Sequence, residues 1–220
     1  MSDLKDRVAI VTGAGRGIGK AIVRVLAQKG MRVGLNDADL ALADTATKEL
    51  RAEGLQVLAL PGDVSRRNEV SAMMDRVELE LGPLWLLVNN AGILNTAPVT
   101  EFTEEAWDKA FEVDAKGVFL CSQAAIKKMI PHHRGRIVNV ASIAGLIVRT
   151  GEIAYCSAKA AVIHFTRCLA VEMAPHGITV NCLCPGMTRT EMLTETAKER
   201  GLDLDAMVEL IPTGHMAEET

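Results

Sequence analysis

The feature that most constrains the fold is a short apolar run followed directly by a glycine-rich stretch. Val8–Val11 is apolar and rich in β-branched residues, which is typical of a buried parallel strand. Four glycines follow at alternate positions: Gly13, Gly15, Gly17 and Gly19. From Lys20 onward the apolar residues take helical spacing. A strand, a glycine turn and a helix in this order can cradle the phosphates of a dinucleotide, because glycine lets the backbone approach a pyrophosphate and the helix N-terminus offers N–H groups.

The spacing of these glycines departs from the common Gly-x-Gly-x-x-Gly fingerprint, because Ile18 stands where the third glycine of that motif would be. The spacing fits Thr-Gly-x-x-x-Gly-x-Gly instead, formed by Thr12, Gly13, Gly17 and Gly19. This variant resembles the glycine motif of the short-chain dehydrogenase/reductase family. A glycine-rich turn without a ligand would give the same pattern, so the rest of the chain has to decide.

Composition narrows the class of protein. A length of 220 residues suits one domain spanning 1–220, and a net charge of −4 without a basic patch argues against a nucleic-acid partner. No apolar run reaches the ~20 residues of a membrane span, and the polar N-terminus does not match a signal peptide. The five cysteines include no Cys-x-x-Cys pair, which predicts reduced thiols, a cytoplasmic protein and no metal site.

Apolar runs that suit strands alternate with amphipathic stretches of helix length. We expect strands at Val8–Val11, Arg32–Asn36, Gln56–Leu60, Leu84–Asn89, Arg136–Val140 and Thr179–Leu183. This alternation predicts an α/β fold with a doubly wound parallel sheet of the Rossmann type, in the strand order 3-2-1-4-5-6. Such sheets bind ligands beyond the carboxyl ends of their strands, so the residues that follow each strand are the candidate site.

Two charged residues bear on the choice of cofactor. Asp37 follows the second strand, close to the ~20-residue spacing after the glycine motif at which a ribose-binding acid is expected. A carboxylate there accepts a hydrogen bond from the ribose 2′-OH and repels a 2′-phosphate, which favours NAD over NADP. Arg16 in the glycine loop favours NADP, because a cation can pair with that phosphate. We predict NAD, since Asp37 should lie directly against the 2′ position; its alternative role is a helix cap.

Two further strand ends supply residues for the adenosine half of the cofactor. After the third strand, Asp63 is placed to accept a hydrogen bond from the adenine amino group, with Val64 against the ring. The alternative role for Asp63 is turn chemistry before the next helix. After the fourth strand, Asn90, Ala91 and Gly92 allow close approach of the ribose, and asparagine amides there can tie neighbouring strands together.

The candidate catalytic residues follow the fifth strand. Ser142 stands at the carboxyl end of that strand, and Tyr155 and Lys159 are four positions apart, so that they share one face of a helix. Reduction of a ketone needs a hydride, which a nicotinamide carries, and a proton, which the protein must supply. A phenol has a pKa of about 10, and a nearby ammonium lowers that value toward neutrality. Lys159 is placed to do this for Tyr155, while Ser142 positions the substrate oxygen.

At this point the resemblance to the short-chain dehydrogenase/reductase family covers nearly the whole chain. The matching motifs, in the order of the family, are Thr12–Gly19, Asn89–Gly92, Ser142, Tyr155-x-x-x-Lys159 and Pro185-Gly186. The resemblance implies NAD(P)-dependent oxidation of alcohols or reduction of carbonyls. The cofactor contacts that it implies outside the strand ends already named are Gly13, Arg16, Gly17, Ile18, Gly19, Tyr155, Lys159, Pro185, Gly186, Met187, Thr188 and Thr190.

One departure from the family lies in the long helical stretch Thr103–Met129, which we expect to be kinked near Gly117. The family usually carries an asparagine there that holds a water linked to the catalytic lysine. Asp114 stands at that position in this chain, where a carboxylate still holds a water but adds negative charge near Lys159. We include Asp114 among the candidate catalytic residues.

The other departure lies after Pro185-Gly186. We expect residues 187–215 to form a lid over the substrate. The family usually continues with a helix and a seventh strand, and we expect this chain to lack that strand because it stops at Thr220. A homodimer or homotetramer is implied by the family, with one interface on two long helices, here around Ala115–Met129 and Glu152–Met173.

The sequence therefore predicts an oxidoreductase that transfers a hydride between NAD(H) and a small-molecule secondary alcohol or ketone. Two alternatives stay open: an NADPH-dependent 3-oxoacyl-carrier-protein reductase, and a C-terminally shortened nucleotide-binding protein with little activity. A mainly apolar substrate pocket is expected from Leu94, Leu146, Ile147, Val148, Met192 and Leu193. Arg149 and Glu152 would add a polar contact, and the substrate itself is not identified.

Overall fold

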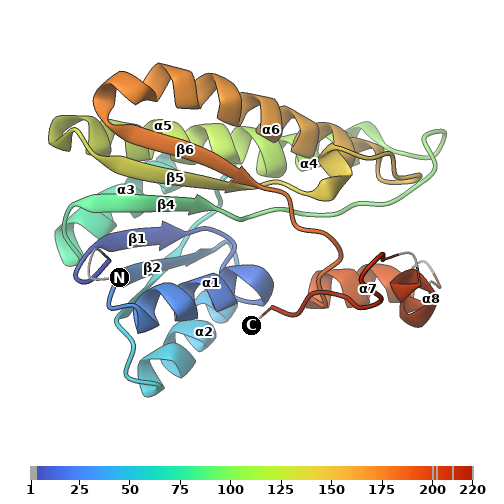
Figure 1. The fold of residues 1–220 in the computed structure, drawn as a ribbon, viewed down its shortest axis with the longest axis horizontal. Helices are drawn as coiled ribbons and strands as arrows, with labels where there is room; N and C mark the ends of the chain where they lie inside the picture. The colour runs from blue at the N-terminus through green and yellow to red at the C-terminus, as the bar shows by residue number, and fades with distance from the viewer. Residues whose placement is uncertain (1–3, 200, 202, 210, 220) are drawn as a thin grey trace.

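The computed structural model describes residues 4–199, 201, 203–209 and 211–219. Six strands form one parallel sheet in the order β3-β2-β1-β4-β5-β6, which confirms the predicted topology (Figure 1). The strands are β1 (Val8–Val11), β2 (Arg32–Asp37), β3 (Val57–Pro61), β4 (Leu84–Asn89), β5 (Gly135–Val140) and β6 (Ile178–Leu183). Each predicted strand matches an observed one to within one residue at either end.

Helices cover both faces of the sheet. They are α1 (Gly17–Gln28), α2 (Leu40–Ala52), α3 (Arg67–Glu80), α4 (Glu104–Phe111), α5 (Gly117–Met129), α6 (Ile153–Met173), α7 (Glu191–Glu199) and α8 (Leu204–Val208). Figure 1 shows α1 and α2 on one face and α3 to α6 on the other. Successive residues of β1 serve the two cores: Ala9 packs in the cluster with Val23 of α1, and Ile10 in the cluster with Met74 of α3. A parallel sheet buried on both faces needs continuous apolar strands, which is why the strands were readable from the sequence.

The predicted kink near Gly117 is a change of helix type. A π-helical turn, Glu112–Lys116, joins α4 to α5. Such turns insert an extra residue and redirect the side chains around them. The turn buries Val113 and Asp114, and a Cβ on Gly117 would lie 2.8 Å from the Val64 side chain. The glycine therefore lets the helix approach the loop that follows β3.

The sheet ends at β6, and no seventh strand extends it among the described residues. Burial alternates along β6, with Thr179, Asn181 and Leu183 exposed, so one face of this edge strand is open to solvent. The chain beyond α8 returns to Thr188, where Ala217 forms an isolated bridge and its carbonyl accepts a hydrogen bond of 2.8 Å from the N–H of Arg189. Within the described part of the chain, no helix is long and apolar enough to span a membrane.

Candidate active site

A cavity of about 430 Å³ opens at the carboxyl ends of the strands. Its lining includes every residue that the sequence assigned to the cofactor, from Gly13 in the glycine loop to Thr190 before α7. Ser142 lines the same cavity, whereas Asp114 does not. The topology brings these residues together because the ends of β1, β4 and β5 lie side by side in the sheet.

The glycine loop is held in a fixed shape by the end of β4. Gly13 has a φ of +59°, and a Cβ on it would lie 2.6 Å from the Cα of Ala91. The Asn90 amide donates to the carbonyls of Thr12 and Gly13 at 3.0 and 2.8 Å. In return, the Thr12 hydroxyl accepts from the backbone N–H groups of Asn90 and Ala91 at 3.0 and 3.1 Å. The threonine of the motif is thus a structural clamp between β1 and β4.

The start of α1 has the features of an anion site. Its N-cap residue Arg16 makes no side-chain cap, and a Cβ on Gly19 would overlap the carbonyl of Gly13. The backbone at Gly17 has a φ of +59° and borders the cavity. A helix N-terminus walled by glycine backbone fits the pyrophosphate of a dinucleotide, so the residues present suit such a cofactor.

Asp37 is held at the rim of this cradle. Its two carboxylate oxygens accept from the N–H groups of Gly15 at 2.9 Å and Asp39 at 3.1 Å. The cap of α2 is Asp39, whose side chain accepts from two N–H groups of the first turn. Asp37 is therefore not the helix cap. Arg16, the cation that argued for NADP, forms a two-pronged ion pair with Glu195 of α7, with N–O distances of 2.8 and 3.3 Å.

Asp63 both lines the cavity and shapes the turn after β3. The N–H and hydroxyl of Ser65 donate to one Asp63 oxygen at 2.9 and 2.7 Å, so the turn chemistry that the sequence left open is present. Partial burial acts to raise the pKa of this carboxyl. The hydrogen bonds from Ser65 and the charges of Lys109 and Arg66 outweigh it and hold the pKa below its ordinary value.

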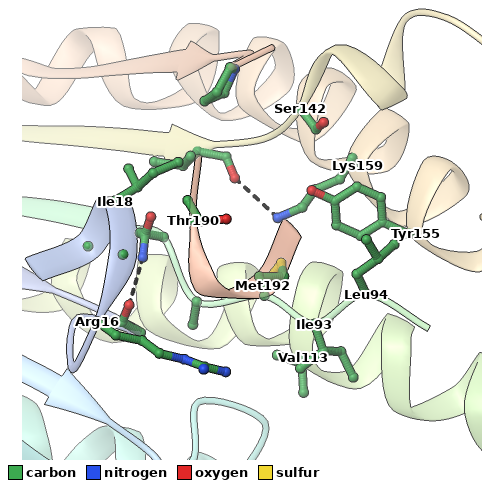
Figure 2. Close-up of a pocket in the computed structure, with 18 of the residues that line it drawn as sticks. Arg16, Ile18, Ile93, Leu94, Val113, Ser142, Tyr155, Lys159, Thr190 and Met192 are labelled. Atoms are coloured by element: carbon green, nitrogen blue, oxygen red, sulfur yellow. Dashed lines mark hydrogen bonds between the residues drawn. The ribbon is translucent and has the colours of Figure 1, made fainter. Parts of the chain in front are cut away.

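Ser142, Tyr155 and Lys159 converge at one wall of the cavity (Figure 2). Tyr155 and Lys159 come from the first turns of α6, and the Lys159 ammonium lies 5.5 Å from the centre of the Tyr155 ring. Lys159 is almost fully buried, and its Nζ donates to the carbonyl of Val140 at 3.2 Å. The Ser142 hydroxyl accepts from the N–H of Ala144 at 3.1 Å.

Asp114 lies behind this wall. It is fully buried, with Oδ1 3.9 Å from Lys159 Nζ, and Oδ1 accepts from the Ile93 N–H at 2.9 Å. Burial raises its pKa to about 6, although the Lys159 charge and the Ile93 N–H oppose the shift. A Cβ on Gly92 would lie 2.7 Å from Asp114 Oδ1 and 3.1 Å from Lys159 Nζ, so this glycine makes room for the pair.

The chain matches the family model described as "short chain dehydrogenase" over residues 7–201. It belongs to the short-chain dehydrogenase family. Members of this family are oxidoreductases that use a nicotinamide cofactor. A curated relative, the 3-oxoacyl-[acyl-carrier-protein] reductase of Synechocystis sp., is 37% identical over 213 residues, covering 96% of this chain and 84% of that protein.

Two solved structures show the same fold with different cofactors. The crystal structure of NAD⁺-bound xylitol dehydrogenase has a TM-score of 0.93 at 27% identity and covers 98% of this chain and 88% of that one. The crystal structure of a variant actinorhodin polyketide ketoreductase with NADPH has a TM-score of 0.93 at 32% identity, covering 100% of this chain and 87% of that one. The likeness to short-chain dehydrogenases thus extends to enzymes of both cofactor types.

A buried polar network lies behind the site of this short-chain dehydrogenase. The sequence suggested that asparagine amides tie strands together, but it did not reveal the other members of the network. Asn89 donates to Ser122 at 3.0 Å and to Asn139 at 2.8 Å, and Asn139 donates to Thr166 at 2.9 Å. The network joins β4, α5, β5 and α6, and it confirms that asparagine ties strands together here. The sequence feature that could have revealed this network is Asn139, a polar residue inside the apolar run of β5, because a buried polar side chain needs hydrogen-bond partners.

The predicted lid, residues 187–215, contains α7 and α8, and three of its positions, 200, 202 and 210, lie outside the described residues. Leu94, Met192 and Leu193 line the main cavity as expected. Val148 lines an adjoining cavity of about 290 Å³. Leu146 and Ile147, which follow the short 3₁₀ turn after Ser142, line neither of these cavities and are 62% and 48% exposed.

Proposed function

We propose that this chain catalyses reversible hydride transfer between NAD(H) and a secondary alcohol or ketone. The supporting observation is that Ser142, Tyr155 and Lys159 border the same cavity as the glycine loop and Asp37. A proton donor and a nucleotide cradle are thus on one continuous surface, which is what this reaction needs.

The cofactor contacts of the proposal follow the cavity from one end to the other. Asp63 and Val64 hold the adenine, Asp37 the adenosine ribose, and the loop Gly13–Gly19 the pyrophosphate. Asn90, Ala91 and Gly92 border the ribose side. Pro185, Gly186, Met187, Thr188 and Thr190 border the nicotinamide, which when bound supplies or accepts the hydride.

Proton transfer in the proposal belongs to Tyr155. In the reductive direction its hydroxyl gives a proton to the carbonyl oxygen, and the resulting phenolate is stabilised by the Lys159 ammonium. The Val140 carbonyl holds that ammonium in place and leaves its other N–H bonds for the cofactor ribose. The Ser142 hydroxyl donates to the same substrate oxygen. In the oxidative direction the proton returns from the alcohol to the phenolate.

The choice of NAD rests on two contacts. Both oxygens of Asp37 are fixed by backbone N–H groups at the cavity rim, so a 2′-phosphate would meet a held negative charge. Arg16, which could offset that charge, is engaged by Glu195. The alternative of an NADPH-dependent 3-oxoacyl-carrier-protein reductase is supported by the relative of that name at 37% identity. A nucleotide-binding protein with little activity is the other alternative.

We also propose a homodimer or homotetramer and a cytoplasmic location. The five cysteines are all free thiols, which suits a reducing compartment. The subunit contact proposed here uses the helical layer that contains α5 and α6.

The proposal is tested by titrating the purified protein with NADH and with NADPH while following nucleotide fluorescence. We expect NADH to bind at least tenfold more tightly, and Asp37→Ala to abolish that preference. Tyr155→Phe should bind NADH normally yet lower kcat with a panel of alcohols and ketones by at least 10³-fold. Equal binding of the two nucleotides would contradict the assignment of NAD, and turnover by Tyr155→Phe would contradict the role of the tyrosine.

A further inference from the structure

An ion pair with a buried carboxylate and a partly exposed arginine lies next to the proposed catalytic wall. Glu152 is 5% exposed and lines the main cavity, and Arg149 Nη1 lies 3.5 Å from its Oε2. Glu152 is the residue that immediately precedes α6, so it stands one helical turn before Tyr155. Glu152 and Tyr155 both line the main cavity, so a ligand in that cavity meets the carboxylate as well as the tyrosine.

A structural role at the helix end does not account for this placement. A carboxylate at a helix N-terminus is stabilised by the helix dipole whether or not it is buried, and the Glu152 side chain makes no capping hydrogen bond. Burial of an ion costs free energy that an apolar side chain of similar size would avoid. What distinguishes Glu152 is that its side chain borders a ligand-sized cavity.

Glu152 and Arg149 also border the adjoining cavity of about 290 Å³, together with Leu94, Val148 and Leu193. The ion pair thus stands where the two cavities meet, and the other residues that line both cavities, Leu94 and Leu193, are apolar. A molecule that reaches from Tyr155 into the second cavity passes the carboxylate. The polar group of such a molecule that meets Glu152 must donate a hydrogen bond, because an ionised carboxylate only accepts.

We propose that Glu152 accepts a hydrogen bond from a substrate hydroxyl on the carbon next to the reacting carbon. The preferred substrates are then vicinal diols and the corresponding α-hydroxy ketones. This inference rests on the proposed function, because it takes Tyr155 as the group that contacts the reacting oxygen. Glu152 and Tyr155 line the same cavity, so an acceptor near Tyr155 suits a hydroxyl on the neighbouring carbon, and Arg149 Nη1 lies 3.5 Å from one oxygen of that carboxylate.

The size of the effect follows from the kind of bond. A hydrogen bond to a charged group corresponds to roughly 10- to 100-fold in a binding or rate constant. A site built around such a bond also rejects the analogue without the hydroxyl, because the buried acceptor then loses its partner. The predicted signature is a preference between two alcohols that differ by one hydroxyl.

The first experiment measures kcat/KM with NAD⁺ for the stereoisomers of butane-2,3-diol and for butan-2-ol. We expect the unmodified protein to prefer at least one diol by tenfold or more. Glu152→Gln should lower that value roughly 10- to 100-fold and leave butan-2-ol within threefold. Glu172 is an exposed carboxylate farther along α6, and Glu172→Gln is the matched control. It should leave kcat/KM unchanged for both the diol and butan-2-ol. Equal losses on both alcohols, or no preference for a diol, would overturn the proposal.

A binding experiment separates this proposal from the proposed function. In Tyr155→Phe with NAD⁺ present, calorimetry should show a lower Kd for the diol than for butan-2-ol, and adding Glu152→Gln should remove the difference. If Tyr155→Phe binds the diol more tightly and Glu152→Gln removes that difference, but the unmodified protein turns over neither alcohol, then Glu152 binds the hydroxyl and the oxidoreductase proposal fails. If butan-2-ol is turned over, and the diol has neither a higher kcat/KM nor a lower Kd, the oxidoreductase proposal stands and the Glu152 proposal fails. The Glu152 proposal also fails if neither alcohol binds.

Discussion

At the scale of single residues, the fold changes the pKa of the Asp114 carboxyl. Its pKa rises from an ordinary value of about 4 to about 6 because the folded chain buries it behind Gly92. Below pH 4 the carboxyl is protonated in both the folded and unfolded states, so its burial does not lower the free energy of unfolding. Between pH 4 and pH 6 the unfolded state ionises first, so the fold loses stability as the pH rises.

We therefore expect Asp114→Asn to raise the free energy of unfolding at pH 8 by about 1–3 kcal/mol, the scale of a shift of about two pKa units. At pH 4 the two proteins should differ by less than about 0.5 kcal/mol. Urea unfolding measured from pH 4 to pH 8 checks this. Asp108→Asn, an exposed carboxylate on α4, is the control and should show no such trend.

The same variant tests whether Asp114 acts on catalysis. Its carboxylate lies 3.9 Å from Lys159, which stabilises the proposed phenolate. We expect Asp114→Asn to move the pH–rate profile of alcohol oxidation while KM for NAD⁺ stays within about twofold. An unchanged profile would leave Asp114 a buried structural residue only.

At the scale of elements, α7 is joined to the glycine loop by the ion pair between Arg16 and Glu195. Both side chains are about half exposed, so the pair contributes at most about 1 kcal/mol to stability. The ion pair also bears on the choice of cofactor. Arg16 is the cation of the glycine loop that could pair with a 2′-phosphate, and Glu195 already binds it.

We expect Glu195→Gln to leave the melting temperature nearly unchanged and to tighten NADPH binding by about three- to tenfold, with NADH within twofold. Fluorescence titration with both nucleotides measures this. Adding Arg16→Gln should remove the gain, whereas Asp205→Asn, an exposed acid on α8, should have no effect. A parallel change in the binding of both nucleotides would show that the ion pair positions α7 without selecting the cofactor.

The same elements show what sequence reasoning can and cannot supply. The strands were predictable because a sheet covered on both faces needs continuous apolar runs. The positions of Asp37 and Ser142 beside the cavity were predictable because parallel strands end at one edge of the sheet. The pair of Arg16 with Glu195 was not, because nothing in the local sequence of either residue encodes a contact across nearly the whole chain. Leu146 and Ile147 were expected in the pocket from their apolar character, but they line neither cavity and are exposed, because apolar character alone does not decide which side of a loop faces the site.

At the scale of the whole molecule, the layer that contains α4, α5 and α6 has exposed apolar side chains. Trp107 of α4 stacks on Phe111 with ring centroids 4.9 Å apart, and Phe119 of α5 is 41% exposed. Val171 of α6 is also largely exposed. A subunit contact on α5 and α6, as proposed, would remove the exposed apolar area of Phe119 and Val171 from water.

We expect the unmodified protein to be a dimer or larger at 50 µM and Phe119→Asp to weaken that association by at least tenfold, because a charge at the centre of an interface must be desolvated without a partner. Light scattering after size-exclusion chromatography measures the mass, and circular dichroism verifies that the variant stays folded. Leu40→Asp is the matched control, since Leu40 is 56% exposed on α2, on the opposite face of the sheet, and should leave the mass unchanged. A monomer at 50 µM would contradict the proposed oligomer, and equal effects of the two variants would place the contact elsewhere than on α5.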